Sequence, residues 1–221
     1  MPKFTRWTWV AHATLAKAHP KIKLSRAQEI LAAYFGHRTY SSFRMHDLGA
    51  LEDLAKYVLV DPEAAVSRAR GMDLPLTSDD WSKVEMALRP SGVSGETWLV
   101  QEDSMHTAAS ITFTDSDDPR ISKIARDIGM GDGYLVSDTQ RLSPPGEFPQ
   151  VLRFAIKGKV RAFNDRGSFA IPVVSEVSFP RVGNRFYGVG QVDSVARQGK
   201  PEEYEPEERL VEFSYVSELN D

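Results

Sequence analysis

The sequence predicts an α+β protein, with a helical domain over residues 1–92 and a β-rich domain over residues 96–221 in which an antiparallel sheet carries one helix. Three observations lead to this prediction. Apolar residues recur every three or four positions in the first part of the chain, which is the spacing of amphipathic helices. In the second part they alternate with polar residues, which is the pattern of half-buried strands. Between the two parts lies PSGVSGE, a run of turn-forming residues at 90–96.

Start and stop signals divide the first part into helices. Ser25 is an expected N-cap, because its hydroxyl can accept from the free backbone N–H groups of a first turn. Asp61-Pro62 has the order of an N-cap followed by proline at the first helical position, and Gly36 stands where a helix ends in a left-handed residue. The expected helices cover residues 4–18, 26–35, 39–45, 48–60, 61–71 and 77–89.

The second part contains strand and turn signals. Asn164–Gly167 and Gly183-Asn184 are turns, and residues 201–208 (PEEYEPEE) form an exposed acidic loop. Asp118-Pro119 begins the one helix expected here, which Gly129 ends. The expected strands cover residues 97–100, 108–113, 151–163, 169–179, 186–196 and 209–216, the last four as an antiparallel meander.

The strand at 151–163 has one apolar face and one basic face. The candidate nucleic-acid-binding residues of the basic face are Arg153, Lys157, Lys159 and Arg161, with Arg181 and Arg185 as possible neighbours. Such a face binds single strands when aromatic side chains stack with the bases, and Phe163 and Tyr187 are the candidates for stacking. The alternative is a solvated outer face, or one that the acidic segments of the chain cover.

Charge is unevenly distributed along the chain, although the formal net charge is only −4. Residues 1–46 contain eight Lys or Arg and one acid, and residues 151–200 contain nine basic and three acidic side chains. The segments 47–150 and 201–221 are acidic. This pattern predicts either basic surfaces that bind a polyanion or ion pairs between the segments.

The composition excludes several classes of function. Without cysteine the chain forms no disulfide, thiolate zinc site, cysteine nucleophile or iron–sulfur cluster. No run of about 18 apolar residues is present, so no membrane span is expected. We expect a cytoplasmic, bacterial-type protein.

Within residues 22–43, Ala27, Glu29, Ile30, Leu31, Phe35 and Gly36 follow one another in a helix-and-glycine pattern. This pattern resembles a small helical module of bacterial proteins from the glyoxalase/bleomycin-resistance group. The resemblance covers about a tenth of the chain and implies a local helical fold. The glyoxalase metal core needs paired His and Glu ligands on βαβββ repeats, and no such repeat follows residue 95, so neither a lyase activity nor a metal is implied. The matching residues are Ala27, Glu29, Ile30, Leu31, Ala32, Phe35, Gly36, Arg38, Tyr40 and Phe43.

The same stretch is similar to the first helix and turn of a helix-turn-helix motif. Its second helix departs from the motif, since Ser42 stands where a hydrophobic residue is usual and Phe43 comes one position later. Basic and polar side chains could still contact phosphates or bases. The candidate nucleic-acid-binding residues of this segment are Arg26, Arg38, Thr39 and Arg44.

Catalytic motifs do not stand out. His106 follows Glu102 and Asp103, which makes a general base conceivable, although a surface histidine is the simpler interpretation. The acidic cluster at 115–118 lacks the glycine and final Glu of a calcium loop and fits a helix N-cap. No cofactor or metal is therefore predicted.

Binding of a macromolecule is the leading prediction, by a non-catalytic accessory or regulatory protein whose first-choice partner is DNA or RNA. Two alternatives remain open. One is an antitoxin-like or immunity-like module that binds a protein through acidic segments and exposed aromatics such as Trp7 and Trp9. The other is an enzyme with a pocket between the domains that uses His106.

Overall fold

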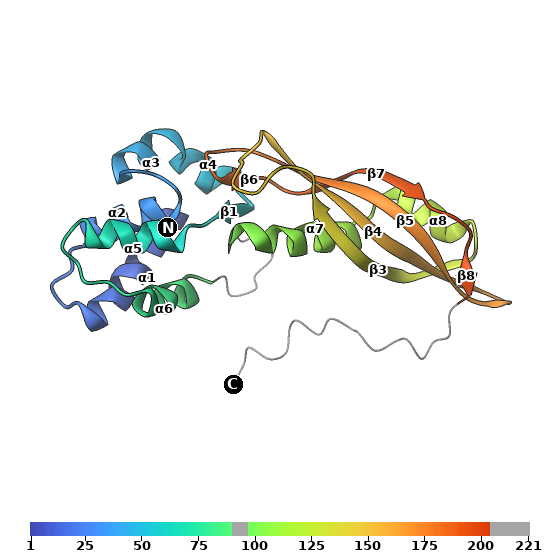
Figure 1. Cartoon of the computed structure of the whole chain (residues 1–221), viewed down its shortest axis with the longest axis horizontal. Helices are drawn as coiled ribbons and strands as arrows, with labels where there is room; N and C mark the ends of the chain where they lie inside the picture. The colour runs from blue at the N-terminus through green and yellow to red at the C-terminus, as the bar shows by residue number, and fades with distance from the viewer. Residues whose placement is uncertain (90–96, 204–221) are drawn as a thin grey trace. The chain divides into compact units, whose positions relative to one another are not determined.

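The computed structural model describes residues 1–89 and 97–203 and has the α+β architecture that the sequence predicts (Figure 1). Its contacts divide the chain into two compact units whose sequence ranges interleave. Unit 1 contains residues 1–109, 141–154 and 178–191, and unit 2 contains 110–140, 155–177 and the residues from 192 onward.

Six α-helices lie within residues 1–89 of unit 1. They are α1 (Lys3–Ala18), α2 (Leu24–Tyr34), α3 (Tyr40–His46), α4 (Leu48–Asp53), α5 (Pro62–Arg70) and α6 (Ser78–Leu88). An aromatic cluster fills the core between them: the Phe4 and Phe43 rings lie 4.6 Å apart, and Phe35 packs against Phe43 at 5.9 Å. The apolar spacing read from the sequence therefore does mark the buried helix faces.

Most of the predicted helix ends are confirmed. Gly36 has a left-handed φ of +84° directly after α2, Asp61 caps α5 with Pro62 at its start, and Thr77 forms a capping box with Asp80 at the start of α6. The Ser25 cap is wrong, because α2 already begins at Leu24 after Lys23.

The predicted helix over 48–60 is wrong in its second half. After α4 the chain forms the strand β1 (Tyr57–Leu59), which pairs in parallel with β2 (Trp98–Val100) and antiparallel with β6 (Phe186–Tyr187). Val58 and Leu59 are fully buried there. A short apolar run of this kind cannot be assigned to helix or strand from its spacing alone.

The second sheet has the order β3-β4-β5-β7, with β8 paired to β5. Its strands β4 and β5 confirm the predictions at 151–163 and 169–179, whereas the strand predicted at 186–196 is split into β6 and β7, which belong to different sheets. The strand predicted at 209–216 lies outside the described residues. The sheet consists of β3 (Met130–Arg141), β4 (Val151–Asn164), β5 (Gly167–Pro180), β7 (Gln191–Arg197) and β8 (Glu202–Glu203).

Between β2 and residue 203, the structure contains two α-helices where the sequence predicts one. The expected helix is α8 (Pro119–Arg126), capped by Asp118, whose carboxylate accepts from the backbone N–H of Arg120 at 2.8 Å. The strand predicted at 108–113 is instead part of α7 (Met105–Thr114), which follows the short 3-10 helix η1 (Glu102–Ser104). Within residues 1–89 and 97–203, no helix is long and apolar enough to cross a membrane.

Candidate functional site

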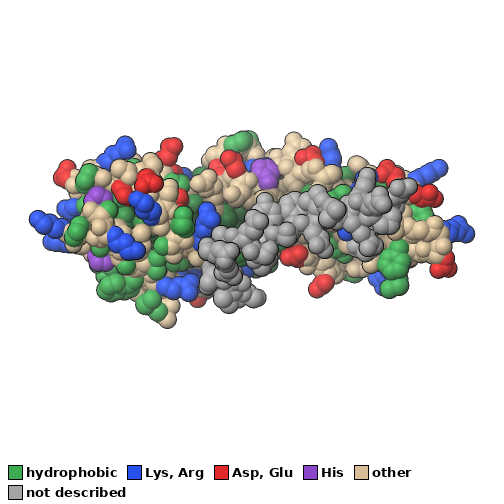
Figure 2. All heavy atoms as spheres, turned by 90° about the horizontal axis from the view of Figure 1, so that it is seen from below, with side chains coloured by type: hydrophobic (Ala, Val, Ile, Leu, Met, Phe, Trp, Pro, Cys, Tyr) green, Lys and Arg blue, Asp and Glu red, His purple; other side chains and the backbone are tan. Residues whose placement is uncertain are grey.

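The basic side chains of residues 1–46 remain without acidic partners in the described structure. None of the eight Lys and Arg residues in this segment forms an ion pair with a described residue. Arg26, Arg38 and Arg44 are all exposed. Figure 2 shows Lys and Arg side chains projecting from the surface of the helices.

Helices α2 and α3 place these arginines. Arg26 lies in the first turn of α2, Arg38 lies in the connection to α3, and Arg44 lies on the exposed side of α3. On the opposite side of α3 the Phe43 side chain is fully buried. Thr39 caps α3, since its hydroxyl accepts from the backbone N–H of Ser42 at 3.1 Å. Phe43 and not Ser42 is therefore the residue that anchors this second helix.

The basic face of β4 has a different environment. In unit 2, Lys157 lies 3.8 Å from the Asp138 carboxylate, and Lys159 lies 2.8 Å from that of Glu202. Arg161 lies near Gly133, to which an added Cβ would come within 3.5 Å of the guanidinium. Two lysines of this face thus pair with carboxylates from the acidic segments, although both pairs remain exposed to solvent.

The other residues assigned to the basic face differ in their positions. Arg153 is exposed at the start of β4, in unit 1. Tyr187 is fully buried, and its hydroxyl donates to the carbonyl of Pro149 at 3.3 Å, so it cannot stack with a base. Burial raises its pKa above the ordinary tyrosine value. Arg181 and Arg185 are wrongly placed by the sequence prediction, because both line polar hollows beside α2 and α3.

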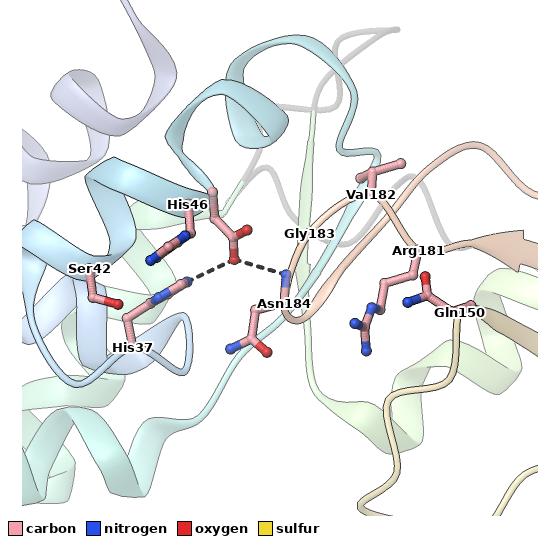
Figure 3. Close-up of a pocket in the computed structure, with 9 residues that line it drawn as sticks. His37, Ser42, His46, Gln150, Arg181, Val182, Gly183 and Asn184 are labelled. Carbon is pink, nitrogen blue, oxygen red and sulfur yellow. Dashed lines mark hydrogen bonds and ion pairs between the residues drawn. The ribbon is translucent and has the colours of Figure 1, made fainter.

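The first of these hollows, here named the His37 hollow, has a volume of about 530 Å³ and lies entirely within unit 1. Figure 3 shows Ser42, His37 and His46 on one side of it, and Arg181 and Gln150 on the other. The first group comes from α3 and the turn before it, and the second from residues next to β4 and β5. Its lining residues are His37, Ser42, His46, Asp47, Gln150, Arg181, Val182, Gly183 and Asn184.

Asp47 joins the two sides of the His37 hollow. Its Oδ2 accepts from His37 Nε2 at 2.9 Å and from the backbone N–H of Asn184 at 2.8 Å. Burial by itself would raise the pKa of Asp47, but these two hydrogen bonds and the charges of His37 and His46 outweigh it and hold the pKa below its usual range. Asp47 is therefore ionised at neutral pH, and both donors are directed at the same oxygen.

The turn at Gly183-Asn184, which the sequence predicts, makes this contact sterically possible. A Cβ on Gly183 would lie 2.9 Å from the Phe186 ring and 3.1 Å from Asp47 Oδ1. Opposite this turn, Arg181 is fixed by residues 148–150, since its backbone N–H donates to the carbonyl of Gln150 at 2.8 Å and its guanidinium donates to that of Phe148.

The second hollow, here named the Arg185 hollow, lies on the other side of His37 and has a volume of about 470 Å³. Three guanidinium groups line it, from Arg38, Arg68 and Arg185. Arg185 pairs with Asp61 at 3.1 Å, and Arg68 pairs with Glu29 at 2.6 Å. Arg38 has no such partner among the described residues, so it leaves an unneutralised positive charge at this hollow.

Of the two acids that the sequence places near His106, Glu102 has other partners. His106 Nδ1 lies 3.0 Å from the backbone carbonyl of Asp103. Glu102 is bound instead to the Arg141 guanidinium and to the backbone N–H of Gly146. Within the described part of the chain, no group of three or more His, Asp or Glu residues could hold a metal ion.

Aromatic residues proposed for protein binding differ from each other in exposure. Trp9 is 52% exposed, whereas Trp7 is only 4% exposed and belongs to the core of unit 1, where its ring lies 5.7 Å from that of Phe35. Of these two tryptophans, only Trp9 is therefore available at the surface to contact a protein partner.

Sequence reasoning missed the His37 hollow as a site. His37 and Asp47 are ten residues apart, and Asn184 follows Asp47 by 137 positions. A search for histidines at helical spacing could not find this group. The only local signals were the caps that flank α3 and the turn at Gly183-Asn184.

Comparison with known proteins finds no match to this chain among family models, curated proteins or solved structures. The residues that resemble the glyoxalase-associated module are mostly packing residues, because Ile30, Leu31 and Phe35 are fully buried.

Proposed function

We propose that this protein is a non-catalytic accessory or regulatory protein that binds nucleic acid through the basic surface of α2, α3 and the segment before them. The observation that carries the proposal is the contrast in charge pairing. The basic side chains of residues 1–46 have no carboxylate partners among the described residues, whereas Lys157 and Lys159 in unit 2 are already paired.

Unpaired lysines and arginines on an exposed surface bind phosphates by releasing condensed counterions, which makes the affinity fall as the salt concentration rises. Arg38 and Arg44 lie at the two ends of the short segment that contains Thr39, whose hydroxyl can donate to a phosphate oxygen. Arg26 adds a further positive charge at the other end of α2. The proposed interface does not include Lys157 and Lys159.

The test is a fluorescence titration of the whole protein with single- and double-stranded DNA and RNA at about 50 and 200 mM salt. The Arg38→Ala/Arg44→Ala variant should bind more weakly at the lower salt concentration. It should also reduce the slope of log affinity against log salt by about 2, since each lost phosphate contact lowers the slope by about 1.

The matched control is Lys157→Ala/Lys159→Ala, which removes the same charge from residues that have carboxylate partners. We expect its salt slope to stay within experimental error of the wild-type slope. Equal slopes for all three proteins, or no binding of any strand at about 50 mM salt, would remove the helical surface from the proposal.

A further inference from the structure

The His37 hollow is lined mainly by hydrogen-bond donors. Arg181, Gln150, Ser42 and His46 line it with side chains that can donate (Figure 3), whereas Asn184 Nδ2 already donates to the carbonyl of Gly36 at 3.4 Å. Among the described residues of the lining, the only carboxylate is that of Asp47, and its Oδ2 already accepts from His37 and from the backbone N–H of Asn184. The remaining hydrogen-bonding capacity of the hollow is therefore suited to an anion.

A metal ion does not fit this lining. Its only acid is largely engaged by hydrogen bonds from the protein, and the described residues offer no cluster of three metal-binding side chains. An apolar ligand does not fit either, since Val182 is the only large aliphatic residue in the lining.

We infer that the His37 hollow binds the terminal phosphate of a nucleic-acid strand. The inference rests on the proposed function. It adds that the hollow beside the basic surface of α2 and α3 binds one particular part of the nucleic acid. A terminal phosphate carries a charge of about −1.5 to −2 and three acceptor oxygens, compared with one charge for an internal phosphodiester. It also projects from the end of the strand, so that it can enter a hollow with donors on two opposite sides.

Arg181 and His46 are the residues expected to contact the phosphate. The backbone N–H of Arg181 donates to the Gln150 carbonyl, and its guanidinium donates to the Phe148 carbonyl, which positions the guanidinium before a ligand arrives. His46 is exposed at the end of α3, two residues from Arg44, and thus links the hollow to the proposed interface. Asp47 acts indirectly, as a positioning residue that holds the His37 ring against the Gly183-Asn184 turn.

The volume of the hollow agrees with this assignment. At about 530 Å³ it lies within the range of about 300–1,000 Å³ that small-molecule sites occupy. A phosphate with its attached sugar therefore fits, and the following nucleotides would continue toward Arg44.

The experiment compares the binding of the full chain to 5′-phosphorylated and 5′-hydroxyl versions of one single strand at about 50 mM salt. A 5′-hydroxyl strand two nucleotides longer controls for total charge, since each added phosphodiester contributes one charge. We expect about tenfold tighter binding of the phosphorylated strand, because hydrogen bonds between charged groups contribute at least that much. AMP, but not adenosine, should compete for this advantage.

Two variants locate the preference in the hollow. His46→Ala alters an exposed side chain, and Arg181→Gln tests the opposite wall; each should reduce the preference to less than about threefold. Both should weaken binding of the phosphorylated strand more than binding of the 5′-hydroxyl strand. Met45→Ala, a change at the exposed neighbour of His46, should keep the full preference. Thermal unfolding of each variant checks that it is folded.

The outcomes separate this inference from the proposed function. Equal binding of the phosphorylated and the longer hydroxyl strand overturns the inference and leaves the proposed interface standing. A preference that survives both His46→Ala and Arg181→Gln also overturns it, because the phosphate would then bind elsewhere. Failure of every strand to bind overturns the proposed function and the inference together.

Discussion

Gly36 is required at its position for two separate reasons. Its φ of +84° is a left-handed conformation that other residues adopt only at a cost. In addition, a Cβ at this position would lie 2.7 Å from the Cδ and Nε atoms of Arg185, whose guanidinium pairs with Asp61. The end of α2 and the wall of the Arg185 hollow therefore both depend on the absence of a Cβ atom at residue 36.

Replacing Gly36 by Ala should destabilise the protein by about 1–3 kcal/mol, since the left-handed strain and the displaced Arg185 act in the same direction. Urea unfolding at neutral pH measures this. The control is Gly49→Ala in α4, where a new Cβ meets nothing within 4 Å and should stabilise the helix by up to about 1 kcal/mol. Equal effects at the two positions would contradict this account of Gly36.

Asp47 makes stability depend on pH in a defined direction. Because its folded-state pKa is lowered, its ionised form contributes stability above the pKa of the unfolded chain and loses it as the pH falls through the folded-state pKa. Asp47→Asn should therefore cost about 1–3 kcal/mol at pH 7. The difference from the wild type should shrink below about pH 4.

Urea unfolding of wild type and Asp47→Asn at several pH values between 7 and 3 measures this difference. Asp53→Asn is the control, because Asp53 is exposed on α4 and has no described partner. Its difference from the wild type should stay near zero throughout. A difference for Asp47→Asn that grows toward low pH would show that the carboxylate is not stabilised in the fold.

At the scale of elements, the sequence predicts best where local chemistry decides the structure. Thr77 and Asp61 cap helices as expected, and the strict alternation in β4 identifies its buried face, with Leu152, Phe154 and Ile156 fully buried. These signals depend on near neighbours in the sequence, so no knowledge of the remaining fold is needed to read them.

The elements predicted wrongly are short apolar segments whose structure depends on distant partners. Residues 57–59 form β1 because β2 and β6 pair with them on both sides. The segment that became α7 contains β-branched residues, which favour strands in isolation, yet Met105 and Ala109 are fully buried on the helix. Tertiary packing overrides local preference in both segments.

At the scale of the whole molecule, the candidate site was not predictable because its walls come from opposite ends of the sequence. His37 and Asp47 lie near the N-terminus, whereas Arg181 and Asn184 follow more than a hundred residues later. Charge segregation could be read from the sequence, but only the structure distinguishes the paired lysines of β4 from the unpaired arginines beside α2 and α3.

The same long-range dependence applies to the core of unit 1. Phe186 of β6 is fully buried, and its ring lies 6.2 Å from that of Phe35 and 6.4 Å from that of Phe43. It follows the Gly183-Asn184 turn directly, so one side chain supports both the helical core and the turn that contacts Asp47. The helices of unit 1 are therefore not an independent packing unit without this strand.

Phe186→Ala should destabilise the protein by about 3–5 kcal/mol, because it leaves a cavity among the aromatic rings. Unfolding in urea, followed by the fluorescence of the buried Trp7 and Trp81 in the same unit, measures the loss. Val189→Ala, three residues away and 70% exposed, should cost less than about 0.5 kcal/mol. A loss below about 1 kcal/mol for Phe186→Ala would mean that the N-terminal helices pack without β6. The His37 hollow would then have to keep its shape without that support.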